Sequence, residues 1–63
     1  MHESKSQGEI MRNALRLVST RGPGALEYAN KMVARMGETG DEQAQAFWEK
    51  ISKQVELLLY ENE

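Results

Sequence analysis

The sequence predicts an all-α fold, a three-helix bundle of up-down-up topology, and three observations lead to this prediction. Apolar residues recur at three- and four-residue spacing in three segments, which is the period of an amphipathic helix. Two glycine-containing breaks, at residues 22–24 and 37–40, separate these segments, and no segment between them has the pattern of a strand. We therefore expect helices over about residues 7–20, 23–36 and 41–60.

The first helix is expected to begin near Ser6. Ser6 and Glu9 have the spacing of a capping box, in which each side chain satisfies a free backbone amide of the other residue. The helix should stop before Pro23, which disfavours helical geometry at the residue that precedes it. The apolar stripe of this helix is Ile10, Met11, Ala14, Leu15, Leu17 and Val18. We expect residues 1–6 to be a disordered N-terminus and residues 7–63 to form a single helical domain.

The second helix is expected to start at Pro23, because a proline at the first helical position lacks only an amide that has no partner there. Gly37 is the expected left-handed residue that ends this helix. The apolar positions between them again follow a helical period; they are Ala25, Leu26, Ala29, Met32, Val33 and Met36. All six are expected in the core.

The third helix should begin around residues 39–41, where Thr39 and Glu42 offer a second capping box. Trp48 is expected to be the largest side chain of the core rather than a binding site. The apolar stripe is the longest of the three and consists of Ala44, Phe47, Trp48, Ile51, Val55, Leu58 and Leu59. Short connections favour antiparallel neighbours, which predicts the up-down-up order.

The length of 63 residues limits the chain to one domain, and a core of this size seldom contributes more than about 3–5 kcal/mol. Without cysteine, no disulfide can add stability. Tight helix packing or dimerisation is therefore expected to complete the fold. Residues 1–36 carry six bases and three acids, whereas residues 37–63 carry two bases and seven acids. These opposite charges can attract within one fold or between two antiparallel copies.

The residue types argue against an enzyme. The only histidine is His2 at the N-terminus, and cysteine is absent, so we predict no catalytic, cofactor-binding or metal-binding residues and infer no small-molecule substrate. Glu38, Asp41 and Glu42 form an acidic cluster, but their spacing does not fit a calcium-binding loop, and helix capping explains them. No apolar run approaches the roughly 18 residues of a membrane span, and the polar N-terminus lacks the core of a signal peptide, so a cytoplasmic location is expected.

The candidate interface lies near the C-terminus. Residues 57–60 are apolar nearly all round, which exceeds what one surface helix requires, so Leu57, Leu59 and Tyr60 are candidate contact residues. Arg12 and Arg16, one turn apart, are expected to add charge complementarity. The same two arginines are the basis of the alternative function, a nucleic-acid-binding accessory protein. Acidic residues at the start of the third helix disfavour that alternative, because phosphates would repel them.

From residue 24 to about residue 59, the chain resembles a group of small uncharacterised bacterial proteins whose domains are of unknown function. The shared features are an alanine-and-methionine helix, a Gly40-Asp41 turn and a helix with Phe47-Trp48 followed by Ile51. The resemblance implies a helical fold and no particular activity. We therefore predict a small non-enzymatic module for protein–protein interaction or regulation, whose partner is another protein or itself. An inhibitor encoded by a mobile element is a special case of this function.

Overall fold

The computed structural model describes the backbone of residues 2–61 and the side chains of residues 7–60. The order of elements is α1 (His2–Arg21), the 3-10 turn η1 (Gly22–Gly24), α2 (Ala25–Thr39), α3 (Glu42–Glu56) and the π-helical turn η2 (Leu57–Glu61). Residues 2–61 contain no strand, so the prediction of an all-helical fold is confirmed.

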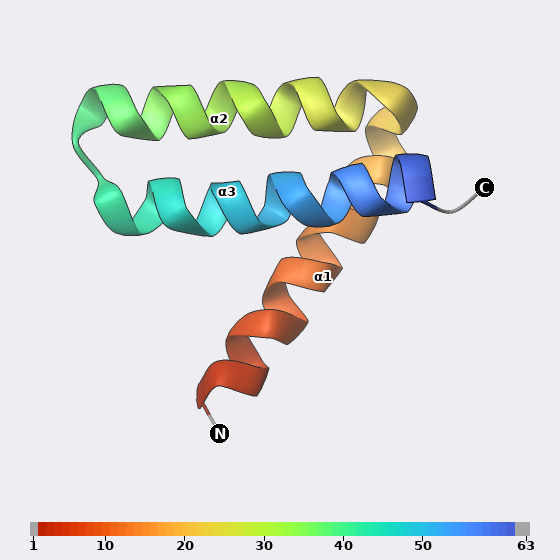
Figure 1. The fold of residues 1–63 in the computed structure, drawn as a ribbon, viewed down its shortest axis with the longest axis horizontal. Coiled ribbons are helices and arrows are strands. Elements are labelled where there is room, and N and C mark those ends of the chain that lie inside the picture. Colours follow the sequence, from red (N-terminus) through yellow and green to blue (C-terminus); the bar gives the residue numbers. More distant parts are fainter. Residues whose placement is uncertain (1, 62–63) are drawn as a thin grey trace.

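Helices α2 and α3 form an antiparallel hairpin (Figure 1). Two side-chain hydrogen bonds join them: Ser52 Oγ donates to Asn30 Oδ1 at 2.6 Å, and Gln45 Nε2 donates to the carbonyl of Val33 at 3.4 Å. α3 also comes close to Gly37, where a Cβ atom would lie 2.6 Å from Gln45 Nε2. A glycine near the end of α2 therefore gives the Gln45 side chain the space it occupies.

Helix α1 runs obliquely across the hairpin instead of alongside it, at the end away from the α2–α3 turn (Figure 1). It packs mainly on α3 and much less on α2. The change of direction occurs in η1, where Gly22 has a φ of 59° and Pro23 occupies the start of the 3-10 turn. The predicted up-down-up order of side-by-side helices is therefore not confirmed.

The start of α1 differs from the prediction. The helix begins at His2 instead of about residue 7, so the predicted capping box at Ser6 and Glu9 does not mark its start. The helix can extend back to His2 because no proline precedes Gly8, and Gly8 itself is helical. The expected disorder of residues 1–6 stays a prediction. Met1, the first residue of that segment, lies outside the described residues.

The turn between α2 and α3 corrects two further predictions. α2 continues to Thr39, and the left-handed residue is Gly40, with a φ of 80°, instead of Gly37. A residue with a side chain rarely adopts this φ, which is why glycine suits this position. The amide of Asp41 donates to the carbonyl of Met36 at 3.1 Å, and Thr39 Oγ1 donates to the same carbonyl at 3.0 Å. Helix α2 thus ends three residues later than expected, at Thr39 instead of Met36.

The N-cap of α3 is Asp41 and not Thr39. Asp41 Oδ1 accepts a hydrogen bond from the amide of Ala44 at 3.1 Å, whereas the Thr39 hydroxyl is engaged with α2. The predicted start of the third helix is confirmed. Its regular α-helical part ends at Glu56, and the remaining residues to Glu61 form the wider π-helical turn η2.

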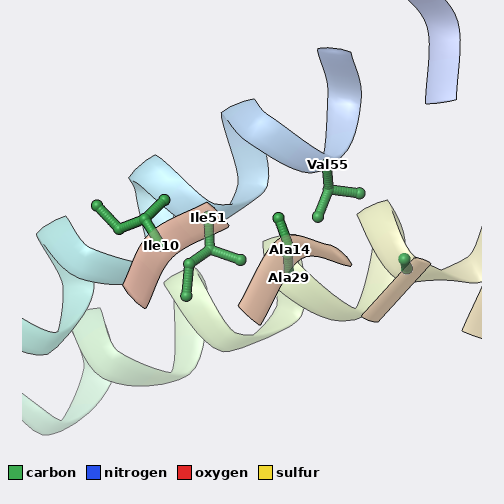
Figure 2. Close-up of a cluster of buried hydrophobic side chains, with 6 residues drawn as sticks. Ile10, Ala14, Ala29, Ile51 and Val55 are labelled. Carbon is green, nitrogen blue, oxygen red and sulfur yellow. The ribbon is translucent and has the colours of Figure 1, made fainter. Parts of the chain in front are cut away.

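The core of the described chain consists of six buried apolar residues contributed by α1, α2 and α3: Ile10, Ala14, Ala25, Ala29, Ile51 and Val55. Figure 2 shows Ile10, Ala14, Ala29, Ile51 and Val55 where the three helices meet. Three of the six are alanines, which let helices approach closely but bury little apolar area each. Met11 and Leu15, predicted in the apolar stripe of α1, are 39% and 51% exposed, so the buried face of α1 is narrower than the stripe.

Candidate protein interface

The apolar residues of the hairpin divide into two groups along its length. Every buried residue of α2 and α3 lies toward the end where α1 crosses, which we call the closed end. Between the closed end and the turn, the apolar side chains are only half-buried; these residues, which we call the open arm, are Met32, Val33, Met36, Phe47 and Trp48. None of these five side chains is fully buried, although Phe47 and Trp48 pack against the core.

The open arm is half-buried because two helices alone cannot enclose a wide apolar face. Phe47 and Trp48 are adjacent in sequence and point about 100° apart, so burying both fully requires neighbours on two sides of α3. α2 supplies one neighbour, and α1 lies at the other end of the hairpin (Figure 1). The molecule is 18 Å across its shortest axis, the thickness of about two helices. No further layer covers the described part of the arm.

Trp48 packs against the core, as predicted, but it is not fully buried. It is half-buried, whereas the largest fully buried side chains among those described are Ile51 and Val55. Its ring meets the Tyr28 ring edge-to-face, with centroids 6.0 Å apart and an interplanar angle of 75°. The guanidinium carbon of Arg21 in turn lies 3.9 Å from the centroid of the Tyr28 ring. Sequence reasoning missed Tyr28, whose position one residue before Ala29 is the only signal that it borders the core.

Charge is segregated around the open arm. The segment 37–49, which forms the turn and the first half of α3, contains four acids and no base: Glu38, Asp41, Glu42 and Glu49. All four side chains are exposed. These acids border the open arm at the turn and on α3, whereas the exposed bases Lys31 and Arg35 border it on α2.

Helix α1 combines exposed apolar residues with exposed bases. Met11 and Leu15 are exposed apolar residues one turn apart, and the exposed arginines Arg12 and Arg16 follow each of them directly. We call these four residues the outer edge of α1. Residues 10–21 contain three bases and no acid, so the outer edge is an apolar strip with a basic margin.

The residues predicted as an interface from the sequence differ in exposure and in position. Leu57 is 41% exposed and Tyr60 is 62% exposed, as a contact surface requires. Leu59 is half-buried and packs against the core, so the structure does not present it with the other two. These three residues lie in η2, at the closed end, whereas Arg12 and Arg16 belong to the outer edge of α1.

One shallow hollow lies where α1 meets α2, with a volume of about 480 Å³. Its lining residues are Thr20, Arg21, Gly24, Glu27, Tyr28 and Lys31. Two of its polar groups already have partners, because Thr20 Oγ1 donates to the carbonyl of Arg16 at 2.9 Å and Arg21 stacks on Tyr28. The hollow holds two cations and one carboxylate.

Three other kinds of feature are not found in the described residues. In the part of the chain that the structure describes, no three histidine, cysteine, aspartate or glutamate residues are grouped to hold a metal ion. No buried side-chain nitrogen or oxygen within residues 7–60 lacks a hydrogen-bond partner. Among the described helices, none has the length and apolar composition needed to cross a membrane.

Comparisons with known proteins add no relative. No protein-family model, curated protein or solved structure matches the chain. The resemblance to small bacterial helical proteins therefore stays a prediction, and the two apolar surfaces are the observations on which a functional proposal rests.

Proposed function

We propose that this protein is a small non-enzymatic module of the cytoplasm that acts by protein–protein interaction or regulation. In this proposal its helices form a three-helix bundle that is incomplete along the open arm, and a partner protein completes it. The observation that carries the proposal is that no side chain of the open arm is fully buried, whereas Ala25, Ala29, Ile51 and Val55 at the closed end are.

The physical argument is one of apolar area. Burying apolar surface contributes about 25 cal/mol per Å², and a small core leaves the chain with little stability of its own. Side chains such as Phe47 and Trp48 therefore gain free energy when another helix covers them. Large aromatic and methionine side chains are also the types enriched where proteins meet. The open arm combines both features.

A capture experiment tests this proposal. The tagged chain is compared with the double variant Met32→Gln/Met36→Gln, which keeps side-chain length at two open-arm positions but makes them polar. A matched control, Lys50→Gln/Lys53→Gln, changes two exposed residues outside the arm. We expect proteins, including untagged copies of the chain, to be retained by the wild type and the control and lost from the arm variant. Equal retention by all three chains would contradict the proposal.

Nucleic-acid binding by the Arg12 and Arg16 face is the second candidate, favoured by the exposure of both arginines on α1. The four acids of residues 37–49 oppose it, because they repel phosphates on the same small molecule. A gel-shift titration at low salt tests it, since phosphate contacts are strongest there. Absence of a shift at low salt would exclude this candidate.

A further inference from the structure

We infer that α1 is a hinged strap, which opens away from the hairpin as one unit while α2 and α3 stay paired. The hinge is η1, and the inference concerns residues 7–21, the part of α1 with described side chains. It goes beyond the proposed function, because it is a movement within one copy of the chain and needs no partner. Three observations carry it: the backbone of η1, the attachment of α1, and the separate links between α2 and α3.

The connection between α1 and α2 has the residues of a hinge. η1 is three residues long and two of them are glycines; Gly22 has a φ of 59° and Gly24 a φ of −77°. A Cβ atom added at either glycine would meet no atom within 4 Å beyond its chain neighbours. Close packing therefore does not require these glycines, whereas backbone freedom explains them, since glycine adopts positive and negative φ about equally readily. Such a turn can change its backbone angles without displacing a packed side chain.

Helix α1 is attached to the hairpin mainly by apolar contact. Its buried and half-buried side chains at the core are Ile10, Ala14, Leu17 and Val18. The side-chain hydrogen bonds of residues 7–21 stay within the helix, as in the bond that Asn13 Nδ2 donates to the carbonyl of Glu9 at 2.8 Å. Opening α1 therefore breaks apolar contacts but none of these hydrogen bonds.

Helices α2 and α3 have links that do not depend on α1. The two interhelical hydrogen bonds, from Ser52 and from Gln45, join α3 directly to α2. The rings of Tyr28 and Trp48 also meet across these two helices. The hydrogen bonds of the glycine turn lie within the hairpin as well. The hairpin can therefore stay paired after α1 has moved.

One contact bridges the hinge and acts as a latch. Arg21 is the last residue of α1, and its guanidinium carbon lies 3.9 Å from the centroid of the Tyr28 ring near the start of α2. A cation over an aromatic ring is attracted to it, but this attraction is modest where solvent reaches the cation, as it does at the exposed Arg21. The latch thus favours the closed position without locking it.

Opening changes the surface that the hairpin presents. Ile51 and Val55 are completely inaccessible while Ile10 and Ala14 of α1 lie at the same core (Figure 2). Once α1 has moved, the closed end of the hairpin presents these two side chains to solvent. The position of α1 therefore decides whether the molecule displays this apolar surface.

Amide hydrogen exchange in dilute purified protein, followed residue by residue by NMR, tests the inference. In the wild type, we expect residues 9–20 of α1 to be at least about tenfold less protected than residues 48–55 of α3. The physical reason is that a local opening exposes the amides of α1 alone, whereas those of α3 exchange only when the hairpin itself opens.

Two glycine variants form a matched pair. Gly22→Ala places a side chain at a positive φ, which is unfavourable only while η1 holds the closed geometry. The protection of residues 9–20 should then fall about tenfold further, while residues 48–55 keep the protection of the wild type. Gly24→Ala makes the same chemical change at a negative φ, where alanine fits without strain, and should leave both segments as they are.

A second pair of variants tests the latch. Arg21→Gln removes the cation from the Tyr28 ring and should lower the protection of residues 9–20 about threefold, again without a change in residues 48–55. Arg16→Gln removes the same charge from another exposed position of α1 and should have no such effect.

Other outcomes would overturn the inference. Equal protection of the two segments in the wild type, or a loss that Gly22→Ala causes in both segments together, would mean that α1 and the hairpin open as one unit. The same exchange in Gly22→Ala and Gly24→Ala would mean that η1 is not the hinge. If Gly22→Ala does not fold, Arg21→Gln decides by the same criterion, and an equal loss in both segments would reject the strap.

Discussion

The closed end and the open arm of the hairpin are built from the same two helices, yet they differ in how well they bury apolar side chains. At the closed end, Ile51 and Val55 are completely inaccessible to solvent because α1 lies across them. One to two turns away on the same helix, Phe47 and Trp48 are half-buried. Phe47 and Trp48 pack against the same core and still keep exposed surface, so a strong apolar pattern does not by itself give full burial in this chain.

This comparison predicts the largest effect at Ile51. We expect Ile51→Ala to lower the free energy of unfolding by about 3–4 kcal/mol, because the side chain is fully buried and its loss leaves a cavity between three helices. Urea denaturation followed by circular dichroism measures the change. The milder variant Ile51→Val should cost about 1 kcal/mol and remain folded. A cost below 1 kcal/mol for Ile51→Ala would mean that Ile51 is not buried between the helices in solution.

The matching substitution in the open arm should cost less. We expect Trp48→Ala to lower the free energy of unfolding by about 2 kcal/mol in dilute protein, since the ring is only half-buried and loses one edge-to-face contact with Tyr28. The same urea titration measures it. A cost equal to that of Ile51→Ala in dilute protein would show that the arm is covered within a single copy and would remove the contrast. A cost that grows with protein concentration would point to cover by a second copy.

The smallest expected effect lies at the tip of the open arm. Asp41→Ala should lower the free energy of unfolding by about 1 kcal/mol, because the amide of Ala44 loses its acceptor at the start of α3. Asp41→Asn keeps an oxygen at this position and should restore most of the loss. Thermal unfolding of the three chains measures both values. An equal loss for the two variants would assign the role of Asp41 to its charge and not to the cap.

Much of the local structure was predictable because it depends on neighbouring residues only. The spacing of apolar residues predicted the helical segments, and glycine in residues 37–40 predicted the turn after the second helix. The errors were also local and small. Gly37 and Gly40 both fit a helix end, and the hydrogen bonds that choose between them run back to Met36 from Thr39 and Asp41. Sequence spacing alone does not rank such alternatives.

The candidate site was predicted less well, because its residues come from separate helices. Leu57 and Tyr60 are exposed and Leu59, also predicted in the apolar stripe, packs against the core, but the interface itself stays a prediction. Trp48 was assigned to the core by its helical spacing from Ile51 and Val55. Its spacing is the same whether or not a third helix lies over it, so no pattern in the sequence could show that it is half-buried.

The sequence by itself determined the three helical segments, the glycine turn and the separation of basic from acidic residues along the chain. These properties follow from short-range sterics, from the spacing of apolar residues and from the positions of charged residues in the sequence. Only the tertiary structure decided that α1 crosses one end of the hairpin and leaves the other end uncovered. Burial depends on which helices meet, and that is set by the direction the chain takes after Gly22 and by the close packing of alanines from different helices.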